Sequence, residues 1–278
     1  MTARIFIGER ETAGIDPANR GLAYGDGVFE TMRVHGGGVP LWPRHLARLQ
    51  EGALRLGIPV PDVAFIEASV AGMLAGCNAG VLKLLVTRGD GARGYAPEPK
   101  ALPAWTLALH PLPASLHGGL RLHWCETRLA VQPALAGIKH CNRLEQVLAR
   151  TECVRQGCDE GLMRDTSGNV VCATGANLLV LHQGTWTTPP VADCGVAGVM
   201  RQWLFDEGMI HVGQVSPAQV EAADALALCS AVRGILTVAN IGALTWQPHP
   251  AVARLRASLV EAYPMFSLPK GVDSTEVS

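Results

Sequence analysis

The chain has 278 residues, which is long enough to bury a substantial core and fits two domains better than one. Hydrophobic residues make up 48% and charged residues 17%, a globular composition, and the formal net charge is −1. This balance provides neither a basic surface for nucleic acid nor an acidic solvating tail, so nucleic acid is not an expected partner.

The cysteines and the amino terminus indicate the compartment. The eight cysteines form no C-x-x-C pair and stand with no paired histidines at zinc-ligand spacing, so we expect reduced thiols and no metal site. The first apolar run is too short for a signal peptide, and no window approaches the roughly 20 apolar residues of a membrane span. The sequence predicts a cytoplasmic protein without membrane contact.

The first hundred residues predict two helices and two strands. Residues 43–56 begin with a proline suited to the first helical position and carry an apolar stripe, so they predict a helix. A second helix is predicted from Asp62, a good N-cap, to about Gly76. Residues 80–88 and 104–112 are apolar and rich in Val, Leu and Trp, which favours buried strands.

A proline- and glycine-rich stretch at 110–119 breaks both periodicities and is the best linker candidate. We therefore expect an amino-terminal domain at 1–113 and a carboxyl-terminal domain at 114–270. The polar residues 271–278 are expected to form a frayed tail.

The second half mixes strands and helices. Strands are predicted near 120–128, 162–164, 170–172, 177–181 and 225–229, the second and third of them as a hairpin. One helix is predicted to begin near Gly198. Another is predicted at about 141–156, with an apolar set roughly on one side: Leu144, Val147, Leu148 and Val154. The class is mixed α and β.

Lysine is rare in this sequence, with four lysines against nineteen arginines. A guanidinium stays protonated and cannot attack a carbonyl, whereas a lysine amine can form a Schiff base. Lys139, in the segment Gly137–Gln146, is the first candidate for that task. The alternative is a surface lysine that opens a helix.

Two further stretches are candidate anion sites. Residues 195–201 fit a helix amino terminus whose backbone N–H groups, at Val199 and Met200, would point at a phosphate. The alternative is that these glycines only mark the start of a helix and bind no anion. Arg44 and Arg48 lie on the first predicted helix, where arginine usually faces solvent, and only wider context assigns either to a phosphate.

A glycine-rich loop at 89–97 joins the two buried strands of the first half. Arg88, Arg93 and Tyr95 lie in or beside it, and two guanidinium groups suit bidentate recognition of a dicarboxylate. The alternative is that these loop arginines only favour solubility.

Together these motifs resemble the fold-type IV pyridoxal-phosphate enzymes, the group of branched-chain and D-amino-acid aminotransferases. The resemblance runs from about Arg20 to Val238 and rests on four group-level stretches: 24–31, 45–49, 177–178 and 198–201. Two narrower stretches, 88–95 and 137–148, are similar to the 4-amino-4-deoxychorismate lyases within this group.

The resemblance implies an α+β fold, with a small amino-terminal α/β domain and a larger, β-barrel-like carboxyl-terminal domain, usually in a homodimer. It implies pyridoxal 5'-phosphate as cofactor, held by a Schiff base to Lys139. It also implies further cofactor contacts from Arg48 at the phosphate, from the backbone of Val199 and Met200, and from Cys172 and Asn177.

The implied reaction converts aminodeoxychorismate to 4-aminobenzoate and pyruvate for folate synthesis, with Arg93 binding a substrate carboxylate and Tyr95 and Arg88 beside it. One position departs from the family. Five residues before Asn177, the family usually has a glutamate that hydrogen-bonds to the pyridine nitrogen, and Cys172 stands there. A neutral thiol lacks the charge that favours a pyridinium, which weakens the electron sink. Two alternatives therefore stay open: an aminotransferase of the same fold and a non-catalytic homologue.

Overall fold

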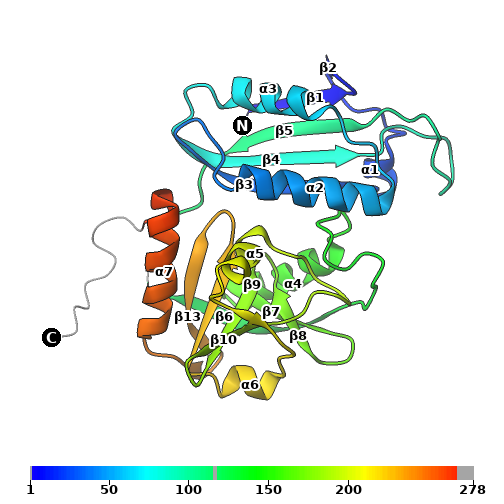
Figure 1. Cartoon of the computed structure of the whole chain (residues 1–278). Coiled ribbons are helices and arrows are strands. Elements are labelled where there is room, and N and C mark those ends of the chain that lie inside the picture. Colours follow the sequence, from blue (N-terminus) through cyan, green and yellow to red (C-terminus); the bar gives the residue numbers. More distant parts are fainter. Residues whose placement is uncertain (1, 115–117, 268–278) are drawn as a thin grey trace. The chain divides into compact units, whose positions relative to one another are not determined.

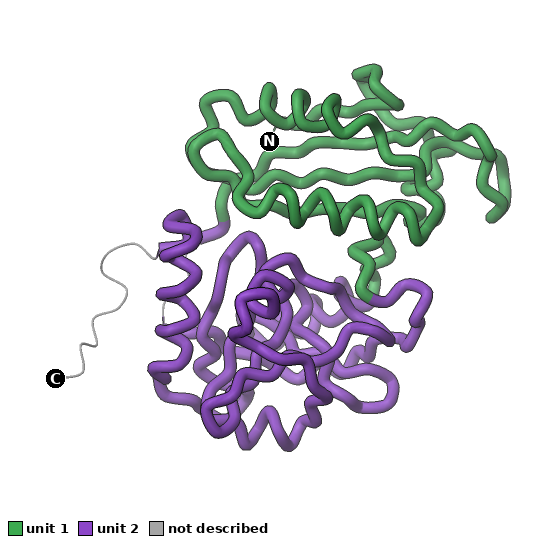
Figure 2. The backbone as a smooth tube through the Cα atoms, viewed as in Figure 1, with its two compact units in different colours: residues 1–112, 137–144 green, residues 113–136, 145–278 purple. Residues whose placement is uncertain are grey.

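The computed structural model describes residues 2–114 and 118–267. The chain divides into two compact units (Figure 2). Unit 1 holds residues 1–112 and 137–144, and unit 2 holds residues 113–136 and 145–278. Each unit has its own sheet and its own helices, so the expected mixed class is confirmed.

This division differs from the expected domain bounds at one segment. The main boundary lies between Leu112 and Pro113, one residue from the expected position, but residues 137–144 join unit 1. Backbone hydrogen bonds tie that segment to a unit 1 strand, and periodicity cannot reveal such a short pairing. The expected tail at 271–278 and residues 115–117 of the expected linker lie outside the described residues.

In the described part of unit 1, an antiparallel sheet has the strand order β2-β1-β5-β4-β3 (Figure 1). Its strands are β1 (Thr2–Ile7), β2 (Arg10–Thr12), β3 (Gly27–His35), β4 (Ala79–Thr87) and β5 (Ala104–His110). Its helices are α1 (Arg20–Tyr24), α2 (Trp42–Leu56) and α3 (Val63–Leu74). The helices predicted at 43–56 and from Asp62 are confirmed, and Asp62 caps α3 by accepting from the Phe65 N–H.

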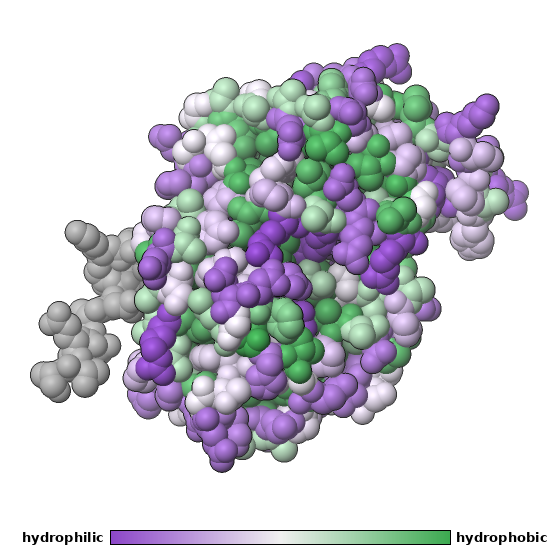
Figure 3. Space-filling view, viewed as in Figure 1, coloured by the Kyte–Doolittle hydropathy of each residue, from purple (hydrophilic) through white to green (hydrophobic). Residues whose placement is uncertain are grey.

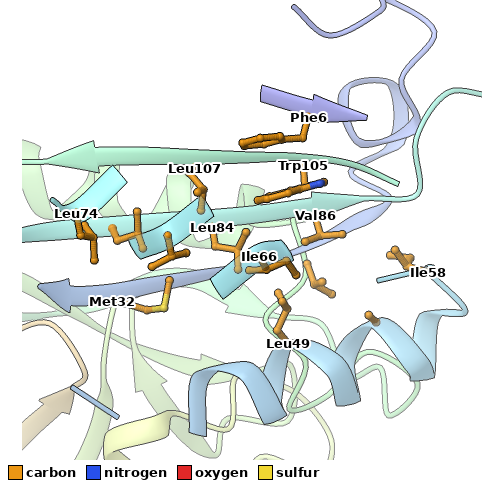
Figure 4. Packing of buried hydrophobic residues seen from close by; sticks show 14 of the residues in the cluster. Phe6, Met32, Leu49, Ile58, Ile66, Leu74, Leu84, Val86, Trp105 and Leu107 are labelled. Carbon is orange, nitrogen blue, oxygen red and sulfur yellow. The ribbon is translucent and has the colours of Figure 1, made fainter. Parts of the chain in front are cut away.

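Alternation along β3 separates the core of unit 1 from the opposite face of its sheet. Val28 and Met32 are buried with Leu49 of α2 and Ile66 of α3 in one apolar cluster (Figure 4). Phe29, Thr31 and Arg33 of β3 are only half-buried. Because side chains of a strand alternate between its faces, the half-buried residues point away from the helices. Phe29 and Thr31 therefore lie on the face of the sheet opposite the helices.

The described strands of unit 2 form a mixed sheet with the order β11-β10-β9-β12-β13-β6-β7-β8, and β14 pairs with β13. Its strands are β6 (Leu120–Leu129), β7 (Glu160–Asp165), β8 (Val170–Ala173), β9 (Asn177–His182), β10 (Thr185–Thr188), β11 (His211–Val212), β12 (Ala225–Ser230), β13 (Gly234–Ile241) and β14 (Leu244–Thr245). The pairs β6·β7 and β6·β13 are parallel, and the predicted hairpin β7–β8 is antiparallel.

Four helices and a short 3₁₀ helix accompany this sheet within the described residues: α4 (Leu144–Arg155), α5 (Val199–Asp206), α6 (Pro217–Glu221), α7 (Pro250–Ala262) and Pro264–Phe266. The predicted helices at 141–156 and after Gly198 are confirmed as α4 and α5.

The apolar set of α4 does not face a core. Leu144, Val147, Leu148 and Val154 are 57–76% exposed, and the buried residues of the helix are Ala149 and Cys153. Small side chains let α4 lie close to its sheet, so the larger ones point outward. Apolar residues also appear among polar ones on the surface drawn in Figure 3.

Candidate functional site

The segment that carries Lys139 is fixed to β3 by its backbone. The Phe29 N–H donates to the Lys139 carbonyl at 3.0 Å, and the Cys141 N–H donates to the Gly27 carbonyl at 2.9 Å. Arg143 folds back along the segment, and its Nε donates to the His140 carbonyl at 2.9 Å. Lys139 therefore extends from a backbone held on both sides.

The amine of Lys139 lies 4.3 Å from the ring centre of Phe29, on the half-buried face of β3. Burial and the neighbouring charge of Arg48 lower the pKa of Lys139 to about 7, against an opposing effect of Glu30. About half of the lysine is thus neutral near pH 7, whereas an ordinary lysine is almost wholly charged. A neutral amine is the form that attacks a carbonyl.

Arg48 is held by a carboxylate that lies inside unit 1. Glu30 is 1% exposed, and one of its oxygens accepts from Arg48 Nε at 2.7 Å. The other oxygen accepts from Arg48 Nη2 and lies 2.6 Å from His45 Nδ1. Burial raises the pKa of Glu30, but the charges and hydrogen bonds of Arg48 and His45 outweigh it, so the net shift is downward. This bidentate pair fixes the direction of the guanidinium.

His45 and His140 are both uncharged, so each can donate or accept hydrogen bonds without adding a positive charge to this region. Burial lowers the pKa of His45, so its Nδ1–H donates to Glu30 while the ring stays uncharged. Burial and Arg143 lower the pKa of His140 to about 4. Within the described chain, His45 Nε2 and His140 Nδ1 have no hydrogen-bond partner, as suits unprotonated ring nitrogens.

Arg88 and Arg20 share the carboxylate of Asp26. Arg88 Nε donates to it at 2.7 Å and Arg20 Nε at 2.9 Å. Arg88 also donates to the carbonyls of Leu56 and Gly57 at the end of α2. All the nitrogens of Arg88 therefore have protein acceptors, and this side chain joins Asp26 to the end of α2.

The glycine-rich loop is clamped through its backbone. Arg20 donates to the carbonyls of Gly94 at 3.0 Å and Tyr95 at 2.8 Å, and Gly94 N–H donates to the Tyr24 hydroxyl at 3.2 Å. Arg93 and Tyr95 themselves are exposed, with Tyr95 at 85%. The loop thus presents these two side chains outward from a fixed backbone.

In unit 2, helix α5 begins without a side-chain cap. Its N-cap is Gly198, and the buried Val199 and Met200 open the helix with free positions for an acceptor at their N–H groups. A Cβ on Gly198 would lie 1.9 Å from Asn177 Oδ1, so only glycine fits there. Asn177 Nδ2 donates to the Val196 carbonyl at 3.0 Å and so fixes the turn before the helix.

Cys172 lies in β8, opposite Met163 of β7. It is 7% exposed and belongs to an apolar cluster that contains Cys125 and Cys194. All eight cysteines are thiols without a disulfide, as the sequence predicts. This position of β8 therefore carries a thiol in apolar surroundings and no carboxylate.

Sequence reasoning assigned no role to Glu30, His45, Lys83 or Arg143, each of which touches or faces the lysine site. A spacing of three residues puts His45 and Arg48 on one side of α2, which is a readable signal. Glu30 has no such signal, because the alternation of its strand is visible only in the structure. The position of Lys83 depends on strand register, which the sequence does not show.

The chain belongs to the amino-transferase class IV family, whose sequence model matches residues 27–241. A 4-amino-4-deoxychorismate lyase from Pseudomonas aeruginosa has a solved structure that is 42% identical, with a TM-score of 0.87 over 93% of this chain and 99% of that one. This likeness confirms the expected fold class.

Two curated relatives are also similar over most of the chain. An aminodeoxychorismate lyase from Vibrio harveyi is 33% identical over 235 residues, covering 81% of this chain and 86% of the relative. A putative branched-chain-amino-acid aminotransferase from Methanocaldococcus jannaschii is 32% identical over 205 residues, covering 70% and 69%. Among the described helices, none has both the length and the apolar character needed to span a bilayer.

Proposed function

We propose that this protein is a pyridoxal-phosphate-dependent lyase that converts 4-amino-4-deoxychorismate to 4-aminobenzoate and pyruvate, a step of folate synthesis. The observation that carries the proposal is the Lys139 amine, held by its backbone against β3 with a pKa of about 7. The lyases from Pseudomonas aeruginosa and Vibrio harveyi support the choice of substrate.

The side chains present fit this cofactor. Lys139 is a neutral amine suited to an aldehyde, and Arg48 is a directed guanidinium suited to a phosphate. Val199 and Met200 offer backbone N–H donors at the start of α5, where the helix dipole favours an anion, and Asn177 fixes that turn. When bound, pyridoxal phosphate supplies an electron-withdrawing ring conjugated to the substrate nitrogen.

The proposed roles of this chain's own residues follow from these properties. Lys139 would hold the cofactor through its amine, and that amine, once free, would take the ring C–H proton of the substrate on its Nζ. A pKa near 7 suits that base, because proton transfer is most effective when the pKa of the base lies near the working pH. Arg93 binds a substrate carboxylate, while Arg20 holds its loop in place through backbone carbonyls.

The decisive experiment couples the purified protein to an enzymatic source of aminodeoxychorismate and measures 4-aminobenzoate and pyruvate. The lyase proposal requires both products in equal amounts. An aminotransferase of the same fold would instead convert D-alanine or a branched-chain amino acid to its keto acid in a half-reaction with the bound cofactor. A protein that binds pyridoxal phosphate but does neither would be the non-catalytic homologue.

Arg93→Ala is expected to lower kcat/KM for the lyase reaction by about tenfold or more, since it loses a charge-assisted hydrogen bond to a carboxylate. Cofactor content, measured by absorbance, should stay at the wild-type level because the side chain is exposed. Arg10→Ala, at an exposed position of β2, is the matched control. Loss of cofactor from the Arg93 variant would contradict the assigned role.

Cys172→Glu is expected to raise the D-alanine half-reaction more than it raises 4-aminobenzoate formation. A carboxylate restores the charge that favours a protonated pyridine nitrogen, whereas the lyase reaction is already driven by its aromatic product. Both rates should be measured in the two proteins. A half-reaction that stays equal or falls, in a variant with normal cofactor content, would show that position 172 does not govern the ring nitrogen.

The same proposal includes a homodimer in the cytoplasm, as the resemblance implies. Each of the eight cysteines is present as a thiol, which suits a reducing compartment. Sedimentation of the purified protein at several concentrations tests the dimer directly.

A further inference from the structure

A second lysine lies on the same face of the unit 1 sheet as Lys139. In the β3·β4 register, Thr31 pairs with Lys83 and Phe29 pairs with Leu85. Since alternate residues share a face, Phe29 and Lys83 lie on one side of the sheet as diagonal neighbours. Segment 139–141 lies along the edge of β3 that does not pair with β4, where Val28 and His140 form a β-bridge. Phe29 therefore lies between the two lysines.

The ring of Phe29 contacts both amines. Lys139 Nζ is 4.3 Å from the ring centre, and Lys83 Nζ is 5.2 Å from it. Both distances are within the range in which an aromatic face attracts a cation. The two nitrogen atoms are consequently less than about 10 Å apart, close enough to repel each other at moderate ionic strength.

The charges that act on Lys139 within unit 1 are mostly positive. Three cations face it: Arg48 from α2, Lys83 from β4 and Arg143 from its own segment. Two uncharged groups also face it, the His45 ring from α2 and the Cys141 thiol from its own segment. Glu30 of β3 is the carboxylate among them, and its oxygens are already engaged by Arg48 and His45. The charge of Lys83 is therefore not cancelled, and in the described part of the chain Lys83 makes no ion pair.

We propose that Lys83 is a positioning residue for Lys139: its cationic side chain, held across the ring of Phe29, adds to burial and to the charge of Arg48 in keeping the Lys139 amine neutral and able to attack a carbonyl. This role of Lys83 rests on the proposed function, because a lysine that forms a Schiff base needs a neutral amine. A neighbouring cation is a general means of activating such a lysine, since it disfavours a second positive charge nearby.

The test measures the protonation of Lys139 without turnover. Full-length protein freed of cofactor is treated with acetic anhydride over a range of pH, and acetylation of Lys139 is quantified by peptide mass spectrometry. In Lys83→Met, the pKa of Lys139 should rise by about half to one unit, so its labelling at pH 7 should fall roughly two- to fivefold. At pH values above both pKa values, the two proteins should label equally.

Two matched variants separate charge from shape. Lys83→Arg keeps the positive charge and should retain the wild-type labelling profile. Lys100→Met removes an exposed loop lysine and should also leave it unchanged. In the cofactor-loaded proteins, the pH midpoint of the cofactor's visible absorption should shift in Lys83→Met and stay in Lys83→Arg.

An unchanged Lys139 profile in Lys83→Met would overturn the inference, and so would equal shifts in Lys83→Met and Lys83→Arg, because packing rather than charge would then be responsible. The result is independent of the reaction catalysed. If the labelling profile shifts as expected while no 4-aminobenzoate is formed, the inference stands and the proposed function fails.

Discussion

Lys139→Arg is expected to abolish both covalent cofactor binding and turnover. The guanidinium keeps the positive charge but cannot form a Schiff base, and it stays protonated, so it cannot act as a base. General acid–base catalysis alone contributes roughly 10²–10⁴-fold, so the combined loss in kcat should exceed about 1000-fold.

The measurement has two parts, product formation and borohydride reduction followed by peptide mapping. In the wild-type protein the pyridoxyl label should appear on Lys139, and in Lys139→Arg it should be absent from that peptide. Lys100→Arg, the same change at an exposed loop position, should behave as the wild type does. A label on Lys83 in the wild-type protein would refute the assignment of the cofactor lysine.

Glu30→Ala is expected to produce the largest loss of stability. It removes a carboxylate that is 1% exposed and that accepts two hydrogen bonds from Arg48 inside unit 1. Removing one partner of a buried ion pair typically costs about 3–5 kcal/mol. Chemical denaturation should show this as a lower midpoint, and cofactor affinity should fall because Arg48 loses its direction.

The matched control is Glu11→Ala, which breaks an exposed pair with Arg4 in the same unit. Solvent screens that pair, so little change in the midpoint is expected. Equal midpoints for the two variants would contradict a special role of the buried cluster.

The pH dependence of the Glu30 contribution has a definite sign. The pKa of Glu30 lies below its ordinary value of 4.5 in the folded chain. Its contribution is therefore fully present above the pKa of the unfolded chain and is lost as the pH falls through the folded value. The stability difference between wild type and Glu30→Gln should shrink on acidification.

Local patterns predicted many of the elements well. Helix α2 and helix α3 were predicted from a first-turn proline and an aspartate cap, and strands β4 and β5 from apolar runs. Strand β3 was not predicted as an element because its entry is dense in glycine and charge. Its alternation became clear only when the buried Glu30 and Met32 were seen to share one face.

The sequence predicts which residues make up the candidate site but not which of them contact one another. The rarity of lysine and the motif around it indicate Lys139, and the loop sequence indicates Arg93. Sequence cannot show that Lys83 reaches the ring of Phe29, because this contact depends on a nine-residue strand register. Nor does it show which side of α4 is buried, since small residues rather than large ones pack there.

The hydrogen bonds that hold the backbone of the glycine-rich loop determine which of its positions can be substituted. Arg20 donates to the carbonyl oxygens of Gly94, Tyr95 and Ala96, which holds the loop through its backbone. Position 93 can therefore be replaced without removing these hydrogen bonds, whereas replacing Tyr95 also removes its ring contact with Tyr24. A library randomised at position 93 should remain largely folded, which makes this position a natural starting point for changing what the loop binds.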